Sequence, residues 1–138
     1  MIAPLSLDDG PRAVALWERV GLTRPWNDPQ ADFARAVTGP PSTVLGASVD
    51  GELVGTVMAG FDGHRGWVYD LAVDPSHQGN GIGEALLNAA ETFLVEAGAP
   101  KVELMVRRTN HAVVGFYERA GYAEEDVVVL ARWLSQEG

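Results

Sequence analysis

A glycine-rich turn, set between a β-rich run and a long helical run, constrains the fold more than any other feature of this sequence. Residues 67–73 read as a strand, and the segment QGNGIG at residues 78–83 follows them. Apolar residues then recur at helical spacing until Gly98 and Pro100 end the helix. Residues 101–107 alternate again as a strand. Because strand–helix–strand units cross over with a right hand, we expect two parallel strands here.

The same reasoning divides the rest of the chain into elements. We expect further strands at residues 2–5, 43–49, 53–61 and 122–133, and helices at about 8–21, 27–39 and 110–121. Asp50-Gly51 joins two of these strands and is a strong hairpin signal. Pro4 suits a strand at the edge of a sheet. With no repeat or linker in between, the sequence predicts a single mixed α/β domain over residues 1–138.

The composition excludes several classes of function. A chain of 138 residues with 46% apolar and 21% charged residues is typical of a globular domain with a real core. It contains no cysteine, which excludes disulfides, thiolate metal sites and cysteine nucleophiles, and we expect no metal site. The net charge of −9 repels a phosphate backbone and argues against nucleic acid as a partner. It favours cationic ligands, or simply keeps the protein soluble.

The N-terminus predicts no export signal. The segment MIAPLSLDDG has no basic region and reaches Asp8 and Asp9 before any long apolar stretch. No apolar run approaches the roughly 20 residues needed to span a bilayer. We therefore expect a cytoplasmic protein with no membrane partner.

The segment QGNGIG is also the strongest candidate for chemistry. Three glycines at alternate positions allow unusual backbone angles and leave amide groups bare, and the helix dipole adds positive potential. Together these features favour an anion, most naturally a pyrophosphate. The spacing GxGxG is neither the dinucleotide-binding GxGxxG nor a Walker loop. On the glycine spacing alone, a structural turn explains the segment equally well.

The sequence resembles the GNAT superfamily of N-acetyltransferases through several motifs that occur in order along nearly the whole chain. The family signature Gln/Arg-x-x-Gly-x-Gly/Ala follows a strand that ends in an apolar triplet. An asparagine follows downstream, and a tyrosine lies seven residues after it. The matching residues here are Leu71-Ala72-Val73, Gln78, Gly81, Gly83, Asn110, and Tyr117 within FYERAGY.

This resemblance implies a GNAT-like three-layer fold, with a central mixed sheet of six to seven strands and helices on both faces. It also implies acetyl-CoA as the acyl donor. The pyrophosphate would lie on the glycine-rich turn, and the pantetheine arm would lie beside the strand before it, where the two parallel strands splay apart. The cofactor-binding residues that the resemblance implies are Leu71, Ala72, Val73, Gln78, Gly79, Asn80, Gly81, Ile82, Gly83, Glu84 and Asn110. Asn110 also suits the role of a plain helix cap. At the position of Asn80 many relatives carry a basic residue, so this sequence departs from the family there.

The implied activity is transfer of an acetyl group to a primary amine. Without a cysteine, direct attack by the amine in a ternary complex is the economical mechanism. The acceptor is expected to be a small amine; a protein N-terminus or lysine is the alternative, and a non-catalytic acyl-CoA sensor is the second. Tyr117 matches the family's usual proton donor, although its helical position also suits a core aromatic. The backbone amide of Leu71 or Ala72 is placed by analogy to stabilise the oxyanion.

The sequence leaves the general base open. Two positions where other subgroups carry a glutamate hold Met105 and Trp67 instead. Asp70, at the expected splay, is the first candidate for a catalytic base. Glu103, His64 and a water chain are the alternatives.

Two loops resemble those of small bacterial members whose substrate is unsettled. They are GLTRPWNDP at residues 21–29 and FDGHRG at residues 61–66, and they predict Trp26, Asn27 and His64 as substrate-binding residues. Trp26 suits a wall against an amine, or a hydrophobic plug between the first two helices. Dimers are frequent in the family, so a homodimer also stays open.

Overall fold

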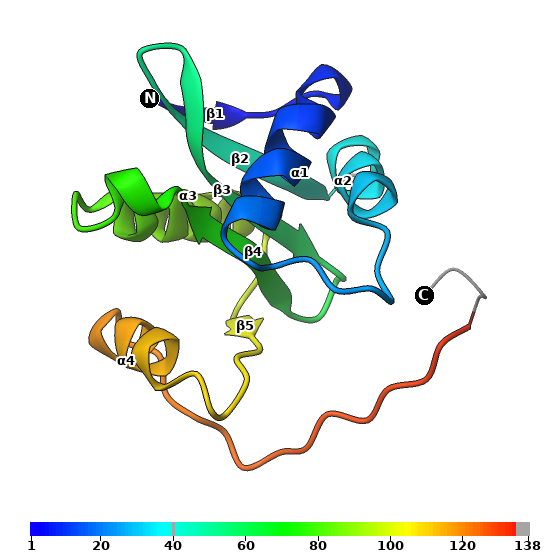
Figure 1. Ribbon diagram of the computed structural model, residues 1–138. Coiled ribbons are helices and arrows are strands. Elements are labelled where there is room, and N and C mark those ends of the chain that lie inside the picture. The colour runs from blue at the N-terminus through cyan, green and yellow to red at the C-terminus, as the bar shows by residue number, and fades with distance from the viewer. Residues whose placement is uncertain (40, 135–138) are drawn as a thin grey trace.

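The computed structural model describes residues 1–39 and 41–134, and it has a mixed α/β fold built on one sheet of five strands (Figure 1). The strands lie side by side in chain order, antiparallel from β1 to β4, with β5 parallel to β4. They are β1 Ile2–Pro4, β2 Ser42–Val49, β3 Glu52–Phe61, β4 Gly66–Val73 and β5 Val102–Leu104. The helices are α1 Gly10–Arg19, α2 Pro29–Thr38, α3 Ile82–Ala97 and α4 His111–Arg119.

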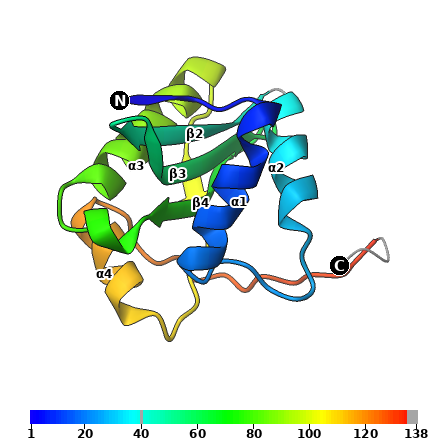
Figure 2. The same ribbon diagram turned by 45° about the horizontal axis from the view of Figure 1, so that its top comes forward.

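Helices α1 and α2 cover one face of the sheet (Figure 2). Trp17 and Phe33 are 2% and 1% exposed, and their ring centroids lie 6.0 Å apart. The helix expected from about residue 27 begins at Pro29: the Asp28 carboxylate caps it by accepting a hydrogen bond from the Ala31 amide, and Pro29 takes the first helical position. These two helices, the segment between them and β4 line the pocket described below.

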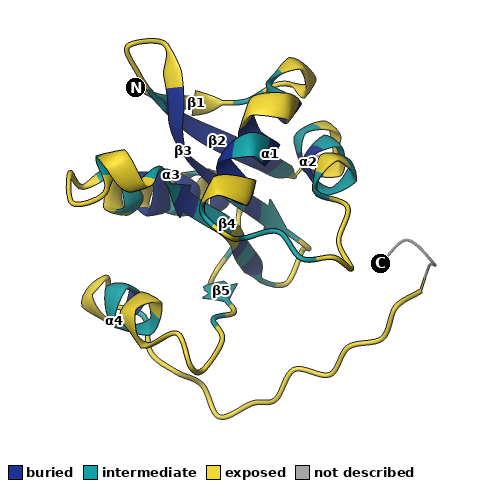
Figure 3. Cartoon of the chain, viewed as in Figure 1, coloured by how far each residue is buried: buried dark blue, intermediate teal, exposed yellow. Residues whose placement is uncertain are grey.

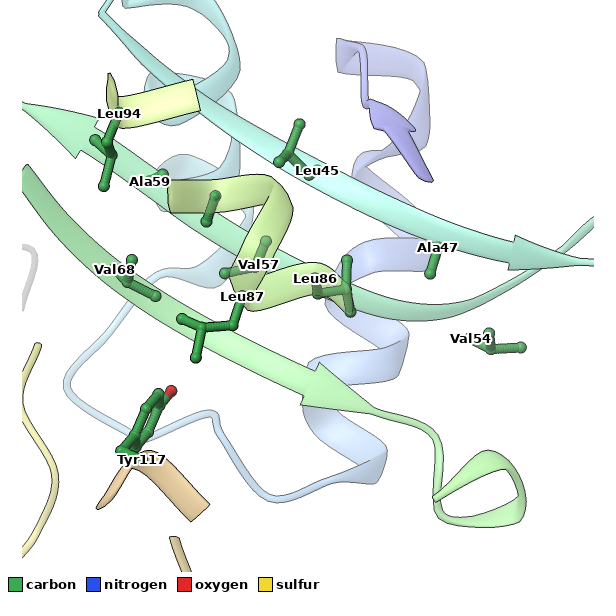
Figure 4. Packing of buried hydrophobic residues seen from close by; sticks show 11 residues of the cluster. Leu45, Ala47, Val54, Val57, Ala59, Val68, Leu86, Leu87, Leu94 and Tyr117 are labelled. Atoms are coloured by element: carbon green, nitrogen blue, oxygen red, sulfur yellow. The ribbon is translucent and has the colours of Figure 1, made fainter. Parts of the chain in front are cut away.

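Helix α3 covers the opposite face. Its apolar stripe is fully buried against β2, β3 and β4, as Figure 4 shows for the larger side chains. Gly55 of β3 allows this close packing, because a Cβ there would lie 2.8 Å from Leu86 Cδ1. Gly98 then ends the helix with a φ of +97°. The predicted helices on both faces are therefore present, as is the parallel crossover from β4 through α3 to β5.

The predicted number of strands is wrong for the described residues, which form five strands rather than six to seven. Residues 122–133, expected as the last strand, form no strand and run away from the sheet (Figure 1). The cause is that β-propensity makes a strand only where a neighbouring edge pairs with it. β5 is also shorter than the predicted 101–107, because β4 pairs only with residues 102–104. Among the described residues, no helix is long and apolar enough to cross a membrane.

Candidate functional site

The glycine-rich turn forms an open cradle at the start of α3. Gly79 and Gly81 have φ angles of +87° and +79°, which side chains rarely adopt, and Gly81 is the N-cap of the helix. No protein atom lies within 4 Å of a Cβ built at either glycine, so the space above the turn is free. No side chain caps the helix, and its first backbone bond comes from the Ala85 amide. The amides of residues 82–84 are therefore free to bind an anion.

The neighbouring predicted residues take different positions around this cradle. Gln78 donates from Nε2 to the carbonyl of Val73 (3.2 Å), so its side chain ties the turn back to the end of β4. Gly83 faces α4, since a Cβ there would lie 3.6 Å from Phe116. Asn80 and Glu84 are exposed beside the turn, and Ile82 is half-buried against the α3 core. The turn thus bridges the ends of β4, α3 and α4.

The last residues of β4 have no neighbour on the β5 side. Pairing with β5 covers only residues 66–68 of β4, whereas the strand continues to Val73. Residues 69–73, which include the triplet Leu71, Ala72 and Val73, are thus left with an unpaired edge. This edge has the position that the resemblance requires for an extended ligand arm.

A β-bulge interrupts β4 at Asp70. Thr56 of β3 pairs with Ala72 and Met58 with Tyr69, so the two residues Asp70 and Leu71 face one residue of β3. Asp70 has a φ of +50°, which is uncommon for any residue other than glycine, although aspartate tolerates it better than most. The bulge breaks the alternation of side chains along β4 and directs Asp70 into a pocket on the α1–α2 face.

Two buried side chains hold the bulge in place. The indole Nε1–H of Trp17 donates to Oγ1 of Thr56 (2.8 Å), and the Thr56 hydroxyl donates to the backbone carbonyl of Asp70 (3.1 Å). Thr56 is fully buried, so both its donor and its acceptor capacity are used inside the protein. This chain of hydrogen bonds links the core of α1 to the strained residue of β4.

The pocket in front of Asp70 contains a second carboxylate. It is lined by Trp17, Leu22, Thr23, Asn27, Pro29, Asp32 and Asp70. Burial, together with the smaller effect of the negative charge of Asp32, raises the pKa of Asp70 from 3.8 to about 6. Asp32 also forms an ion pair with Arg35 on the outside of α2. A cationic group in this pocket would stabilise the charged form of the Asp70 carboxylate and so offset the cost of its burial.

Only some of the residues predicted to bind the substrate line the pocket at Asp70. Asn27 lines the pocket, whereas Trp26 beside it does not and is 47% exposed. Trp26 is therefore no buried plug between α1 and α2; Trp17 fills that place. His64 lies in the exposed β3–β4 loop, where its amide donates to Oδ1 of Asp62 (2.7 Å), and it does not line the pocket. Glu103, another candidate base, lies 3.5 Å from Arg65 in an ion pair.

Tyr117 is a core residue whose polar end faces the sheet. Its side chain is 8% exposed, and its hydroxyl points from α4 towards β4 (Figure 4). The ring makes edge contacts with Phe116 and Tyr122, at centroid distances of 5.2 and 5.6 Å. Burial raises the pKa of Tyr117 to about 12, so the phenol stays protonated at neutral pH. Asn110 caps α4, accepting from the Val113 amide (3.4 Å).

Sequence reasoning missed Asp32 and Thr56, along with the role of Trp17 in holding the bulge. Trp17 carries only the signal of an apolar helical stripe, and Thr56 that of a strand residue. Asp32 follows a helix start and looks like an ordinary first-turn carboxylate. Only the packing of α1 and α2 on the sheet brings them together. Within the described part of the chain, no group of histidine and carboxylate side chains is arranged to hold a metal ion.

Comparisons with known proteins agree with this fold. The model of the acetyltransferase (GNAT) family matches residues 13–122. An acetyltransferase of Pectobacterium atrosepticum is 45% identical over 130 residues, which cover 94% of this chain and 92% of the relative. An aminoglycoside acetyltransferase from an uncultured soil sample is 25% identical with a TM-score of 0.79, covering 98% of this chain and 96% of its own. A ribosomal-protein-alanine N-acetyltransferase of Brucella melitensis is 26% identical with a TM-score of 0.74, covering 96% and 99%.

Proposed function

The chain belongs to the acetyltransferase (GNAT) family, and on that premise we propose that it transfers the acetyl group of acetyl-CoA directly to the primary amine of a small molecule. The observation that carries the proposal is the position of Asp70. The bulge turns its carboxylate into a pocket shortly after Val68, where β4 loses its β5 neighbour, so an acceptor in the pocket could meet an acyl donor along the edge.

The cradle at residues 79–84 fits the pyrophosphate of acetyl-CoA. Its two positive-φ glycines leave open space, and the uncapped amides of α3 offer donors at the positive end of the helix. When bound, acetyl-CoA supplies the activated acetyl group as a thioester. The open edge of β4 at Leu71 and Ala72 then offers backbone groups to the extended arm and an amide to the carbonyl oxygen of the acetyl group.

Asp70 acts as the general base in this proposal. A pKa of about 6 leaves its carboxylate ionised at neutral pH yet more basic than an exposed aspartate. As the amine nitrogen bonds to the acetyl carbon, it becomes positively charged and its proton becomes acidic; Asp70 accepts that proton. Tyr117 donates its phenol proton to the sulfur as the carbon–sulfur bond breaks, and regains one from solvent. Asp32 attracts the ammonium form of the acceptor into the pocket, and that form loses one proton to solvent before the neutral amine attacks.

The pocket favours a small cationic amine over a protein substrate. The names of the two structural relatives above point to different acceptors, an aminoglycoside and a ribosomal protein alanine, at almost equal identity. Likeness therefore does not choose between the acceptors, and the pocket geometry is what supports a small cationic one. It lies beside α1 and α2, the buried Trp17 is part of its wall, and its charged lining groups are the carboxylates of Asp32 and Asp70.

The first test is calorimetric titration with acetyl-CoA, with coenzyme A and ATP as comparisons. We expect saturable binding of acetyl-CoA and coenzyme A but not ATP; no binding of acetyl-CoA at millimolar concentration would refute the cradle. Thiol release is then measured over a set of mono- and diamines, amino sugars and short peptides. Asp70→Asn should bind acetyl-CoA normally but turn over about 10² to 10⁴ times more slowly, the usual contribution of a general base. Asp50→Asn is the matched control, because Asp50 also has a positive φ (52°) but lies in the β2–β3 turn.

A further inference from the structure

Two aromatic side chains of β4 lie on the same face of the sheet as α1 and α2. Tyr69 pairs with Met58 of β3, and Met58 packs against the buried cluster on the α1–α2 face. Residues directly opposite each other on neighbouring strands share a face, so Tyr69 points to that side. Trp67, two residues earlier, shares this face, while Val68 between them is buried against α3 on the other.

The β-bulge brings Tyr69 and Asp70 to one surface. In a regular strand these consecutive side chains would point to opposite faces. Because Asp70 and Leu71 together face one residue of β3, the alternation is broken, and Asp70 enters the pocket on the same side as Tyr69. Tyr69 itself does not line that pocket, so its ring lies next to the carboxylate and outside the pocket wall.

Trp67 and Tyr69 form a stacked pair, called the aromatic pair below, that is open to solvent. Their ring centroids lie 6.4 Å apart and their planes are 15° from parallel. Tyr69 is 41% exposed and Trp67 is half-buried. Gly60 of β3 lies opposite Trp67, so the cross-strand partner adds no side chain over the indole. Residues 62–64 of the adjoining β3–β4 loop are also exposed (Figure 3). Accessible aromatic rings of this kind attract cations through their π faces.

A second carboxylate, that of Asp62, lies beside the aromatic pair. Its Oδ1 accepts hydrogen bonds from the amides of residues 64 and 65 (both 2.7 Å). These bonds, and to a smaller degree the side chain of Trp67, lower the pKa of Asp62, so it is ionised at neutral pH. Its charge also reaches the other ring, because burial and then the Asp62 charge raise the pKa of Tyr69. The aromatic pair therefore has a carboxylate next to each of its rings.

We propose that the aromatic pair binds a second cationic group of the acceptor while the reacting nitrogen lies at Asp70, so that the acceptor is an aliphatic diamine. This inference rests on the proposed acetyl transfer. The carboxylates of Asp62 and Asp70 attract a dication and repel an acceptor that carries a carboxylate of its own, such as a free amino acid. Arg65, in the same loop, pairs with Glu103 (3.5 Å), and that ion pair neutralises its charge.

The spacing along β4 sets the length of the diamine. Trp67 and Asp70 are three residues apart, which corresponds to roughly 7–10 Å along a bulged strand. An extended chain of about four to seven carbons spans that distance between its two nitrogens. The nitrogen at Asp70 loses its protons during transfer, whereas the distant nitrogen keeps its charge throughout and stays on the rings.

Thiol release with hexamethylenediamine and hexylamine tests the proposal, because the two amines differ only in the second amino group. In the wild type, kcat/KM should be roughly 5- to 30-fold higher for the diamine, the range expected of cation–π contacts at partly exposed rings. Trp67→Leu and Tyr69→Leu should reduce this preference by raising the KM of the diamine, with kcat and the values for hexylamine unchanged. Tyr69→Phe keeps the ring and should keep the preference. Trp133→Leu, at a tryptophan that is 61% exposed in the C-terminal segment, is the matched control.

Calorimetric titration with the same two amines, without acetyl-CoA, separates this inference from the proposed function. Hexamethylenediamine should bind more tightly than hexylamine, and Asp62→Asn, which keeps Oδ1 as an acceptor but removes the charge, should weaken only the diamine. Asp50→Asn, in the β2–β3 turn, should change neither. Equal affinity and equal kcat/KM for the two amines would overturn the proposal and leave acetyl transfer standing. Selective binding of the diamine without any acetyl transfer would refute the proposed function, and with it the role of the diamine as acceptor, but not the cation site.

Discussion

Replacing Asp70 by asparagine should stabilise the protein at neutral pH while removing its activity. Burial and the nearby charge of Asp32 raise the pKa of this carboxyl group from 3.8 to about 6, so between these pH values the folded state keeps a proton that the unfolded state has lost, and at neutral pH the folded state holds an unfavourably buried charge. A shift of about two units corresponds to about 3 kcal/mol of unfolding free energy. Because the folded pKa is the higher one, wild-type stability falls as pH rises between about 4 and 6, and the full cost is present above pH 6.

The assay is urea unfolding of the wild type and Asp70→Asn at a series of pH values. The two proteins should be nearly equally stable below pH 4, and the variant should be more stable by about 3 kcal/mol above pH 6, which is on the order of 10 °C in Tm for a chain of this length. Hydrogen bonds lower the pKa of other carboxyl groups, such as those of Asp9 and Asp74. Protonating these groups as pH falls reduces the unfolding free energy of both proteins alike. The difference between the two curves therefore isolates Asp70.

If the difference in unfolding free energy between the wild type and Asp70→Asn does not change with pH, the reasoning is refuted. It is also refuted if Asp70→Asn is less stable than the wild type at pH 7. Asp50→Asn controls for loss of a carboxylate at a positive φ. Asp32→Asn gives an independent check, since removing the nearby charge should lower the pKa of Asp70. The lower inflection of kcat/KM against pH should then move from near pH 6 to lower pH, and the KM of a cationic acceptor should rise.

Three further substitutions test residues of the proposed site. Thr56→Val removes the acceptor of the Trp17 indole and should cost about 1–3 kcal/mol in urea unfolding, whereas Thr56→Ser should restore most of it; equal losses would exclude the hydrogen bonds as the cause. Gly81→Ala should weaken acetyl-CoA binding in calorimetry, while Gly63→Ala, at a similar positive φ in the β3–β4 loop, should cost about 1–2 kcal/mol of stability without weakening binding. Tyr117→Phe should lower turnover with little change in acetyl-CoA affinity, and an unchanged rate across pH would contradict its role as proton donor.

The elements that sequence patterns predict well are those whose signals are local. The glycine-rich turn is an example: Gly79 and Gly81 occupy the two positive-φ positions of the cradle, and the helix begins directly after them. The end of α3 at Gly98 is equally local. Each depends on one backbone conformation or one hydrogen bond within a few residues, so the order of residues is sufficient to identify it.

The features that the sequence predicted wrongly depend on contacts between distant segments. Residues 122–133 have the composition of a strand, but a strand also needs a free edge within reach, and no sequence pattern states where that edge is. The length of β5 depends in the same way on how far β4 stays beside it. The sequence predicted the splay only through its resemblance to a family, because strand divergence has no signature of its own in either strand.

The pocket at Asp70 shows why a site built from distant segments is harder to predict than one built from a single segment. The cradle comes from one continuous segment, whereas the pocket combines Trp17 of α1, Asp32 of α2, and the Thr56–Asp70 contact between β3 and β4. Asp70 was a candidate because it precedes the apolar triplet, but what makes it basic is the burial imposed by α1 and α2. A carboxylate with a raised pKa and a positive φ costs stability, and the buried hydrogen bonds of Thr56 hold it there regardless. This combination of strain, burial and dedicated support is what we expect of a residue kept for chemistry, and it supports our proposal that the acceptor binds on the α1–α2 face of the sheet.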